Sequence, residues 1–245
     1  MTFWEHLDVL RGSIIRMSCV VLVFGMIAFV FKDELFSIVL APKNSHFISY
    51  RLFNVEPFNI KLVNIGLTEQ FMVHMKTAFF FGIIAASPYI LYLLYHFISP
   101  ALYRKEKRYT IRIISCGYIM FIIGLLTNYF IIFPLTVRFL GTYSVSTEVS
   151  NLLSLQSYID TLLMTSLVFG ILFEIPIISW LMAVMGIIKA EWMQKYRRHA
   201  IVTILIISAI ITPTTDAFTL FIVFMPIWLL YELSILIVRI TNTQK

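Results

Sequence analysis

The chain has 245 residues, of which 60% are hydrophobic and 13% are charged. Soluble globular domains are about half apolar and about a quarter charged, so this composition excludes a domain that faces water on all sides. The 19 basic and 13 acidic residues give a formal net charge of +6. In a chain with long apolar segments, this excess bears on orientation in a membrane, and no nucleic-acid partner is predicted. Cys19 and Cys116 both lie inside apolar segments, so no disulfide framework and no zinc site is predicted.

Apolar segments with few charges predict six membrane-spanning helices in one all-α domain, residues 1–245. About 17–25 apolar residues are needed to cross the hydrocarbon layer as a helix, and all but one of the segments reach that length. The predicted helices cover about residues 12–31, 69–97, 113–137, 158–188, 199–213 and 217–238. A turn-forming run from Thr212 to Asp216 separates the last two, which therefore form a tight hairpin of two short helices. We expect the bilayer to thin beside the fifth helix.

The distribution of lysine and arginine predicts that both termini are cytoplasmic. An even number of spans places both ends on one side of the membrane. The N-terminus, the second and fourth loops and the C-terminal tail together carry 13 of the 19 basic residues. Short cytoplasmic loops are enriched in basic residues, so this side is assigned to the cytoplasm. Acidic Glu5 and Asp8 precede the first span and no small-residue cleavage site follows Phe31, so we expect that span to remain in the mature protein.

Apart from Glu69 and Asp160 at the ends of their spans, two acidic residues fall inside the predicted spans. Glu174 lies near the middle of the fourth span, and Pro176 follows it and favours a bend. A carboxylate at mid-bilayer costs several kcal/mol unless it is paired, hydrated or protonated, so Glu174 is a functional candidate. The structural alternative is a protonated Glu174 that joins two helices by a hydrogen bond. Glu232 lies near the cytoplasmic end of its helix and can reach the interface.

The long first loop, from Lys32 to Lys76, is too polar to span and contains two prolines, Pro42 and Pro57. It ends in Thr68-Glu69, which predicts an N-cap with a carboxylate in the first helical turn. No GxSxG, HExxH, P-loop or GxGxxG motif occurs, and the five histidines are scattered. The sequence therefore predicts neither an enzyme nor a bound cofactor or metal.

Short motifs occur in a fixed order along nearly the whole chain. They are His6-Leu7 with Leu10-Arg11, Ala41-Pro42, Thr68-Glu69 with Phe71 and Lys76, Pro88, Ser99-Pro100-Ala101-Leu102-Tyr103 with Glu106, Tyr129-Phe130 with Phe133-Pro134 and Phe139-Leu140, Phe169-Gly170 with Phe173-Glu174 and Pro176, Met185-Gly186, Thr212-Pro213, Asp216, Pro226 and Glu232. Their order matches the six-helix layout. With these motifs the chain resembles the TatC family, the multispanning core subunit of the twin-arginine (Sec-independent) protein translocase.

This resemblance implies a concave, glove-like bundle of six helices in the cell membrane. It implies a receptor that binds twin-arginine signal peptides of folded precursor proteins and recruits single-span TatA-type subunits, with TatB-type subunits as a further possible partner. It also implies export driven by the proton gradient without a cofactor, and a homo-oligomer within the complex.

The resemblance also implies two groups of site residues. For signal-peptide binding these are Glu106, Tyr103, Asp8 and Arg11. Because the surrounding face is basic, local carboxylates must pair with the arginines of the peptide. Glu106 follows the Pro-Ala-Leu-Tyr motif and is the first choice; its structural alternative is an exposed pair with Lys105 or Arg108.

At the N-terminal motif the sequence departs from the family, because Val9 stands where a glutamate is expected. Asp8 comes one position earlier, about 100° around a helix, so it can substitute only if the segment rotates or the peptide binds differently. For intramembrane and partner docking, the implied residues are Glu174, Thr212, Asp216, Pro42 and Glu69. Ala209 and Leu220 stand where the family often has methionine and glutamine.

A second function stays open from the residues alone. A proton-coupled secondary transporter could use Glu174 as its titrating carboxylate. Against it, the chain shows no internal repeat and no paired broken helices. An intramembrane hydrolase is a more distant alternative, because no catalytic constellation is evident.

Overall fold

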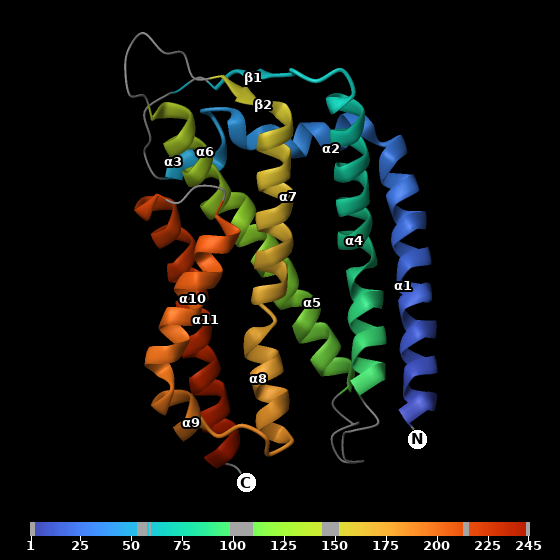
Figure 1. Ribbon diagram of the computed structural model, residues 1–245, viewed down its shortest axis with the longest axis vertical. Helices are drawn as coiled ribbons and strands as arrows, with labels where there is room; N and C mark the ends of the chain where they lie inside the picture. The colour runs from blue at the N-terminus through green and yellow to red at the C-terminus, as the bar shows by residue number, and fades with distance from the viewer. Residues whose placement is uncertain are drawn as a thin grey trace. The chain divides into compact units, whose positions relative to one another are not determined.

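The computed structural model describes residues 3–52, 58, 60–98, 110–143, 152–212 and 216–243. These residues are almost entirely helical (Figure 1). Within these described residues, five helical segments are long and apolar enough to cross a membrane: Leu7–Val30, Glu69–Phe97, Ile113–Thr142, Leu155–Val184 and Ala217–Asn242. The predicted all-α membrane fold is therefore confirmed. The count of six spans and the cytoplasmic termini stay predictions.

The chain divides into two compact units. Unit 1 comprises Met1–Tyr118 and Gly141–Leu163, and unit 2 comprises Ile119–Leu140 and Met164–Lys245. The boundaries fall inside three helices: α5 (Thr110–Thr127), α6 (Phe133–Thr142) and α7 (Leu155–Leu172). The prediction of a single domain stays a prediction.

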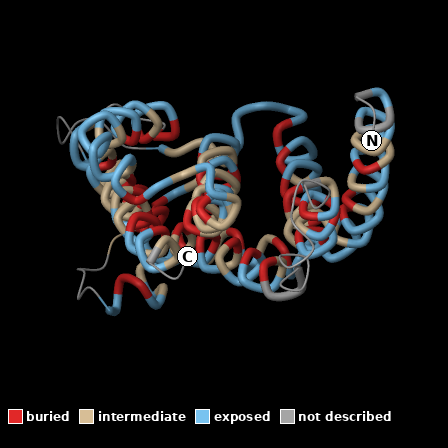
Figure 2. Tube along the Cα trace, turned by 90° about the horizontal axis from the view of Figure 1, so that it is seen from below, coloured by how far each residue is buried: buried red, intermediate tan, exposed pale blue. Residues whose placement is uncertain are grey.

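In unit 1, helices α1 (Phe3–Val30) and α4 (Glu69–Ile98) pack side by side along their length (Figure 1). Two glycines permit the close approach. A Cβ atom on Gly82 would lie 2.7 Å from the backbone nitrogen of Gly25, and small residues at such a crossing let two backbones meet within a membrane. Most of α1, which starts at the N label in Figure 2, is exposed, as expected for a helix that faces lipid.

Short elements close one end of unit 1. They are α2 (Lys32–Val39), the 3₁₀ turn η1 (Ala41–Lys43), α3 (Ile48–Leu52), and the strands β1 (Leu62–Val63) and β2 (Leu153–Ser154). The two strands are parallel, with Leu62 opposite Leu153. We call this group of elements, with the start of α4 and the start of α7, the cap of unit 1. The sequence predicted only a polar loop for α2, η1, α3 and β1.

In unit 2, α5 continues through a π-helical turn, η4 (Asn128–Ile132), into α6. The remaining helices are α7, α8 (Ile175–Val184), α9 (Ala190–Lys195), α10 (Arg197–Ile211) and α11 (Ala217–Thr243). α11 packs against α8, α9 and α10. The core of unit 2 is apolar and includes Phe169, Phe173, Ile211, Val223 and Ile227.

The helices of the structure depart from the predicted bounds most clearly in two places. The first concerns the hairpin of two short helices: α10 has 15 residues, but α11 has 27 and runs beyond the predicted end at 238. A helix does not stop at Arg239, because an arginine at the end of a span can extend its charged head towards water. The second concerns the span 158–188, which breaks at Phe173–Glu174 and ends before Met185.

Gly186 explains the early end of α8. Its φ of 75° is in the left-handed region that glycine adopts without strain. The backbone N–H groups of Gly186 and Ile187 donate to the carbonyls of Ala183 and Met182. This pattern is a Schellman motif, which satisfies the last carbonyls of a helix and turns the chain away from its axis.

Candidate functional site

Two of the four residues predicted for signal-peptide binding lie on α1, and the other two are not described. Glu106 and Tyr103 lie outside the described residues. Asp8 and Arg11 are on the first turns of α1, and both are exposed. Three residues apart, they share one side of the helix. Val9 is half-buried, and its carbonyl accepts a hydrogen bond of 2.9 Å from the Ser13 hydroxyl.

Glu69 begins α4 and is the centre of the cap of unit 1. Its Oε2 accepts hydrogen bonds from the backbone N–H groups of Ile65 (3.0 Å) and Gly66 (2.9 Å). Its Oε1 accepts from the Ser154 hydroxyl (2.9 Å) and from the Gln156 N–H (2.8 Å). The residue is only 6% exposed. One carboxylate thus joins the segment before α4 to the start of α7.

Pro42 lies in the same cap. It is buried in η1, and its carbonyl accepts a hydrogen bond of 2.8 Å from the Tyr50 hydroxyl. The neighbouring Val39 carbonyl accepts one of 3.1 Å from the hydroxyl of Tyr158, on α7. Glu69 therefore contacts the start of α7 directly, and Pro42 lies three residues after Val39, which also does. In each case the polar groups are engaged within unit 1.

Further along α4, Lys76 adds an ion pair to this connection. Its ammonium group lies 2.7 Å from the carboxylate of Asp160 on α7. Both side chains are 41% exposed, so the pair is partly screened by solvent and contributes little alone.

Glu174 lies at the break between α7 and α8 in unit 2. Its backbone carbonyl accepts the N–H groups of Ile177 and Ile178, and Pro176, which has no N–H to donate, sits in the first turn of α8. The side chain does not cap α8. Its Oε1 atom is buried and makes no hydrogen bond to any described residue. The span therefore holds a carboxyl group with unused hydrogen-bonding capacity, which is costly in an apolar environment.

The turn between α10 and α11 carries Thr212 and Asp216. Thr212 is 6% exposed and ends α10, and its hydroxyl lies 3.3 Å from the Ala209 carbonyl. The Asp216 carboxylate accepts the N–H of Thr219 at 2.6 Å, which makes Asp216 the N-cap of α11. The hydroxyls of Ser208 and Thr219 are buried without a partner among the described residues. Around this turn, the Asp216 carboxylate is hydrogen-bonded as an N-cap, whereas the Ser208 and Thr219 hydroxyls have no hydrogen-bond partner among the described residues.

Two polar pairs in unit 2 were not predicted. Asn128, which starts the π-helical turn, donates a hydrogen bond of 2.8 Å to the Ser166 hydroxyl on α7, and Asn128 is fully buried. Arg197 at the start of α10 pairs with Glu232 on α11. An asparagine within an apolar run was a visible signal, because polar groups inside a span need partners.

Comparisons with known proteins identify the family. The family model described as "Sec-independent protein translocase protein (TatC)" matches residues 5–226. The TatC protein of Aquifex aeolicus is 33% identical over 246 residues, which cover 100% of this chain and 98% of that protein. The TatC protein of Koribacter versatilis is 34% identical over 96% of this chain and 84% of its own length.

A crystal structure described as the twin arginine translocase receptor TatC superposes with a TM-score of 0.82. It is 34% identical, and the alignment covers 97% of this chain and 99% of that one. A second crystal structure of the same receptor, in DDM, gives a TM-score of 0.81. The sequence resemblance to this family is thereby confirmed: the chain belongs to the TatC family and is a multispanning membrane component of the Sec-independent, twin-arginine protein translocase.

Proposed function

We propose that this chain is the receptor for twin-arginine signal peptides of folded precursors, and that it recruits TatA-type subunits within the membrane. In this proposal both termini face the cytoplasm, the cell membrane is its location, and the proton gradient drives export. The chain acts as a homo-oligomer, with a TatB-type subunit where the system has one. Solved structures of relatives that are described as receptors support the first part.

The observation that carries the second part is the unused Oε1 atom of Glu174. A buried carboxyl oxygen without a partner costs free energy until a donor reaches it. A polar side chain on a single-span helix would supply that donor only when the helix docks. Docking of the partner is therefore favoured, because the new hydrogen bond removes the free-energy cost of the unpaired Glu174 oxygen in the isolated chain.

Thr212 and Asp216 extend this proposed docking region. The buried hydroxyls of Ser208 and Thr219 near the same turn also lack partners among the described residues. Pro42 and Glu69 contribute differently, since their polar groups are already engaged within unit 1. We infer that these two residues hold the cap of unit 1 together and do not donate hydrogen bonds to a partner.

For signal-peptide binding we propose that Glu106 takes one arginine of the peptide, with Tyr103 beside it. Asp8 is exposed on α1 and is an acid next to the position of Val9. A guanidinium group pairs with a carboxylate through two parallel hydrogen bonds, which a lysine cannot form. Arg11 lies on the same side of α1 and would hold Asp8 in position.

Export of a folded reporter tests this function in cells that lack the native gene and carry this chain with its companion subunits. An Arg-Arg leader should support export and a Lys-Lys leader should not. Glu106→Gln should weaken crosslinking of Arg-Arg leaders more than that of Lys-Lys leaders. Glu34→Gln, which changes an exposed acid on α2, is the matched control. It should leave the crosslinking of Arg-Arg leaders and of Lys-Lys leaders unchanged. If leaders crosslink no better than scrambled peptides, the chain is not the receptor.

A further inference from the structure

Three aromatic side chains follow one another along the second half of α4 in unit 1. The rings of Tyr89 and Tyr92 are stacked with their centroids 6.4 Å apart, and those of Tyr92 and His96 with their centroids 6.1 Å apart. All three residues are exposed. We call them the aromatic stripe of α4. Neither tyrosine hydroxyl makes a hydrogen bond to the residues that the structure describes.

The stripe begins directly after Pro88, which lies inside α4. A proline cannot donate a hydrogen bond to the carbonyl four residues earlier. The Ser87 hydroxyl donates one of 2.7 Å to this carbonyl, which belongs to Ile84. The backbone at the proline is therefore satisfied within α4, and the tyrosine hydroxyls are left as donors that α4 itself does not use.

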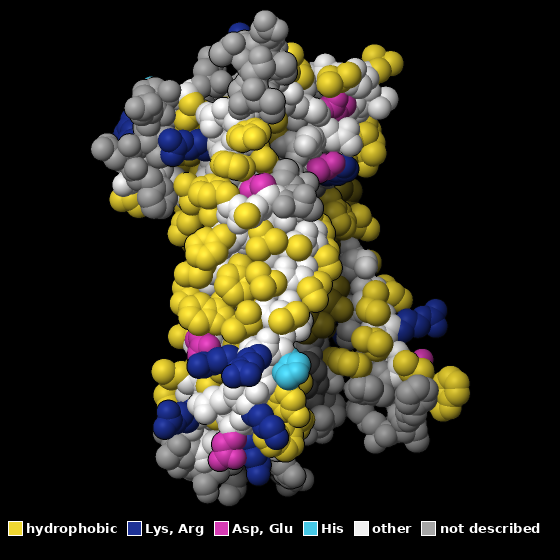
Figure 3. Space-filling model, turned by 60° about the vertical axis from the view of Figure 1, so that its left-hand side comes forward, with side chains coloured by type: hydrophobic (Ala, Val, Ile, Leu, Met, Phe, Trp, Pro, Cys, Tyr) yellow, Lys and Arg dark blue, Asp and Glu magenta, His cyan; other side chains and the backbone are white. Residues whose placement is uncertain are grey.

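Tyr89 lies deeper in its apolar segment than an interfacial tyrosine does. The segment ends at Phe97, and Tyr92 and Tyr89 come five and eight residues earlier, which is about 7 and 12 Å along the helix. Interfacial tyrosines lie at the headgroup level, where charged side chains border the hydrophobic band that Figure 3 shows. A hydroxyl more than two turns inside needs an acceptor within the bilayer, because water is absent there.

The stripe runs beside α1 and leads to residues proposed to bind the arginines of the signal peptide. Its members come seven, ten and fourteen residues after Gly82, which contacts α1, so all three fall within about 80° of that contact around the helix. α1 and α4 run in opposite directions (Figure 1). Arg11 comes fourteen residues before Gly25, the residue that Gly82 contacts. Arg11 therefore lies near the level of His96, with Asp8 about one turn further out.

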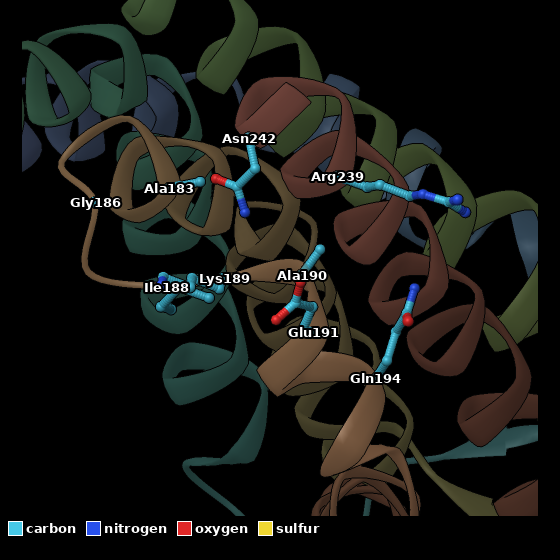
Figure 4. A pocket seen from close by; sticks show the side chains of 9 residues that line it. All are labelled: Ala183, Gly186, Ile188, Lys189, Ala190, Glu191, Gln194, Arg239 and Asn242. Carbon is cyan, nitrogen blue, oxygen red and sulfur yellow. The ribbon is translucent and has the colours of Figure 1, made fainter. Parts of the chain in front are cut away.

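The hollow that Figure 4 draws in unit 2 does not align its polar groups in this way. It lies among α8, α9 and α11, and its volume is about 660 Å³. The Arg239 side chain points away from Lys189 and Glu191 (Figure 4), so the charges of the lining do not converge on one ligand. The stripe, in contrast, places its polar groups along one face of one helix.

We propose that the aromatic stripe binds the apolar segment of a signal peptide whose arginines are held at the cytoplasmic end of α4, a role that rests on the proposed function. Signal peptides carry an apolar segment of about 7–15 residues after their basic end. As a helix this segment is about 10–22 Å long, so it ends inside the roughly 30 Å of hydrocarbon. Its last four carbonyls then have no partner within the helix, which is costly in lipid.

The tyrosine hydroxyls supply the missing donors. A helix of about eight residues that starts at the level of Phe97 ends at the level of Tyr89, whose hydroxyl donates to a terminal carbonyl. The rings of Tyr92 and His96 pack against the apolar side chains nearer the cytoplasm. Lipid acyl chains have no acceptor for these hydroxyls, so the peptide is the favoured occupant of the stripe.

Site-specific photocrosslinking tests where the peptide lies, in membranes that contain the full chain and its companion subunits. The photoreactive residue p-benzoylphenylalanine replaces Tyr89 or Tyr92. In the matched control it replaces Leu94, which is 44% exposed on another face of the same turns. In a fourth chain it replaces Lys107, next to Glu106. An Arg-Arg leader should crosslink from every position except Leu94, and a Lys-Lys leader should crosslink from none.

The outcomes separate the stripe from the receptor function. Crosslinks at Lys107 without crosslinks at Tyr89 or Tyr92 would show that the leader binds elsewhere, and the receptor function would stand. Equal crosslinking from Leu94 and Tyr89 would likewise overturn the stripe as the binding face. If the leader crosslinked from none of the four positions, the receptor function would be contradicted as well.

Tyr89→Phe tests the hydroxyl separately, because it keeps the ring. The affinity for the Arg-Arg leader should fall about fivefold through the loss of one hydrogen bond, and the melting temperature should not change. Tyr118→Phe is the matched control, since it removes a hydroxyl from a 36% exposed side chain on α5, and it should bind the leader like the wild-type chain. Unchanged affinity of Tyr89→Phe, or an equal loss in Tyr118→Phe, would show that the Tyr89 hydroxyl does not contact the peptide.

Discussion

Two glutamates, one in each unit, have opposite surroundings. Glu69 in the cap of unit 1 receives four hydrogen bonds that engage both of its carboxylate oxygens. Glu174 in unit 2 lies at a break between two helices, and its Oε1 atom receives none from the described residues. Both acids stand at or beside the start of a helix, and both are conspicuous in an apolar chain.

The difference teaches how to assign a role to a buried acid. A carboxylate whose acceptor capacity is met by its own chain stabilises that chain, and it has little to offer a second molecule. A carboxyl oxygen left without a donor raises the free energy of the isolated protein, and a binding partner can recover that cost. On this criterion we expect Glu69 to be structural, and we propose Glu174 as the docking residue. Substitutions at the two positions should therefore affect different measurements.

The largest effect is expected for Glu174→Ala. Export of a folded reporter with an Arg-Arg leader should be blocked, while crosslinking of the leader stays normal, because Glu174 is not among the residues proposed to bind the leader. A hydrogen bond to such a group is worth about 1.5–3 kcal/mol, or roughly a 10- to 150-fold change in docking of the partner subunit. The export rate of the reporter measures the loss of transport, and co-purification of the TatA-type subunit measures the loss of docking.

Glu174→Gln sharpens this test. The amide keeps an acceptor oxygen and the same shape, so docking should fall less than in the alanine variant. The melting temperature of either variant in detergent should not decrease, because no bond within the chain is lost. Normal export by Glu174→Ala would refute the docking role. A clear loss of thermal stability would instead indicate a structural role like that of Glu69.

The second largest effect is expected for Glu69→Ala, and it should appear in stability. The N–H groups of Ile65, Gly66 and Gln156 would lose their common acceptor. The melting temperature of the purified chain should fall by several degrees, and hydrogen exchange at these three amides should accelerate. Glu69→Gln retains one acceptor oxygen and should give an intermediate change.

Glu34→Gln is a suitable control for Glu69→Ala and Glu69→Gln as well, since Glu34 is an exposed acid on α2 in the same unit. Its melting temperature should equal that of the wild-type chain. If Glu69→Ala melted like the control but failed to bind the partner subunit, the assignment of Glu69 to the cap would be wrong.

The all-α membrane fold could be predicted from the sequence because the signal of a membrane-spanning helix is local. A run of about twenty apolar residues must be a helix in a membrane, whatever lies around it. Glu174 could be singled out as a candidate for the same reason, because a carboxylate in such a run is costly in any arrangement. The break at Glu174 followed from Pro176, whose ring weakens the helix locally.

The cap of unit 1 could not be predicted in the same way. The groups that engage Glu69 include Ser154 and Gln156, which are 85 and 87 residues away in the sequence. No local pattern specifies which distant donors meet one carboxylate. The length of α11 was underestimated for a different reason, since the charge of Arg239 was taken as the end of an apolar segment, although the helix continues past it.

A third prediction concerns the helix pair that supports the cap. A methyl group on Gly82 would lie 2.7 to 2.9 Å from the backbone of α1 at Val21 and Gly25. Gly82→Ala should force α1 and α4 apart and reduce the stability of unit 1 by about 1–3 kcal/mol. Thermal unfolding in detergent, followed by circular dichroism, would measure the loss.

Gly12→Ala is the matched control within the same pair of helices. Nothing lies within 4 Å of a Cβ placed on Gly12, so the substitution should be neutral or stabilise α1 by up to about 1 kcal/mol through its backbone entropy. Equal destabilisation by both substitutions would mean that the helix crossing at Gly82 is not close.

The smallest effect is expected for the buried pair Asn128 and Ser166, which is the counterpart of the Glu69 network inside unit 2. Their hydrogen bond of 2.8 Å joins the π-helical turn to α7. Hydrogen bonds between membrane helices contribute about 0.6 kcal/mol on average, because the unfolded chain in the membrane also finds partners. A double-mutant cycle with Asn128→Ala and Ser166→Ala should therefore give a coupling of about this size.

The cycle also distinguishes the two kinds of polar group. The Asn128 Oδ1 atom lacks a partner among the described residues, as Glu174 Oε1 does, but Asn128 also donates a hydrogen bond within its own unit. If coupling is near zero and export falls, Asn128 belongs with Glu174 as a group that serves a partner. If coupling is measurable and export is unchanged, Asn128 has a structural role like that of Glu69. In that case an acceptor atom without a donor indicates a docking residue only when its side chain makes no other hydrogen bond.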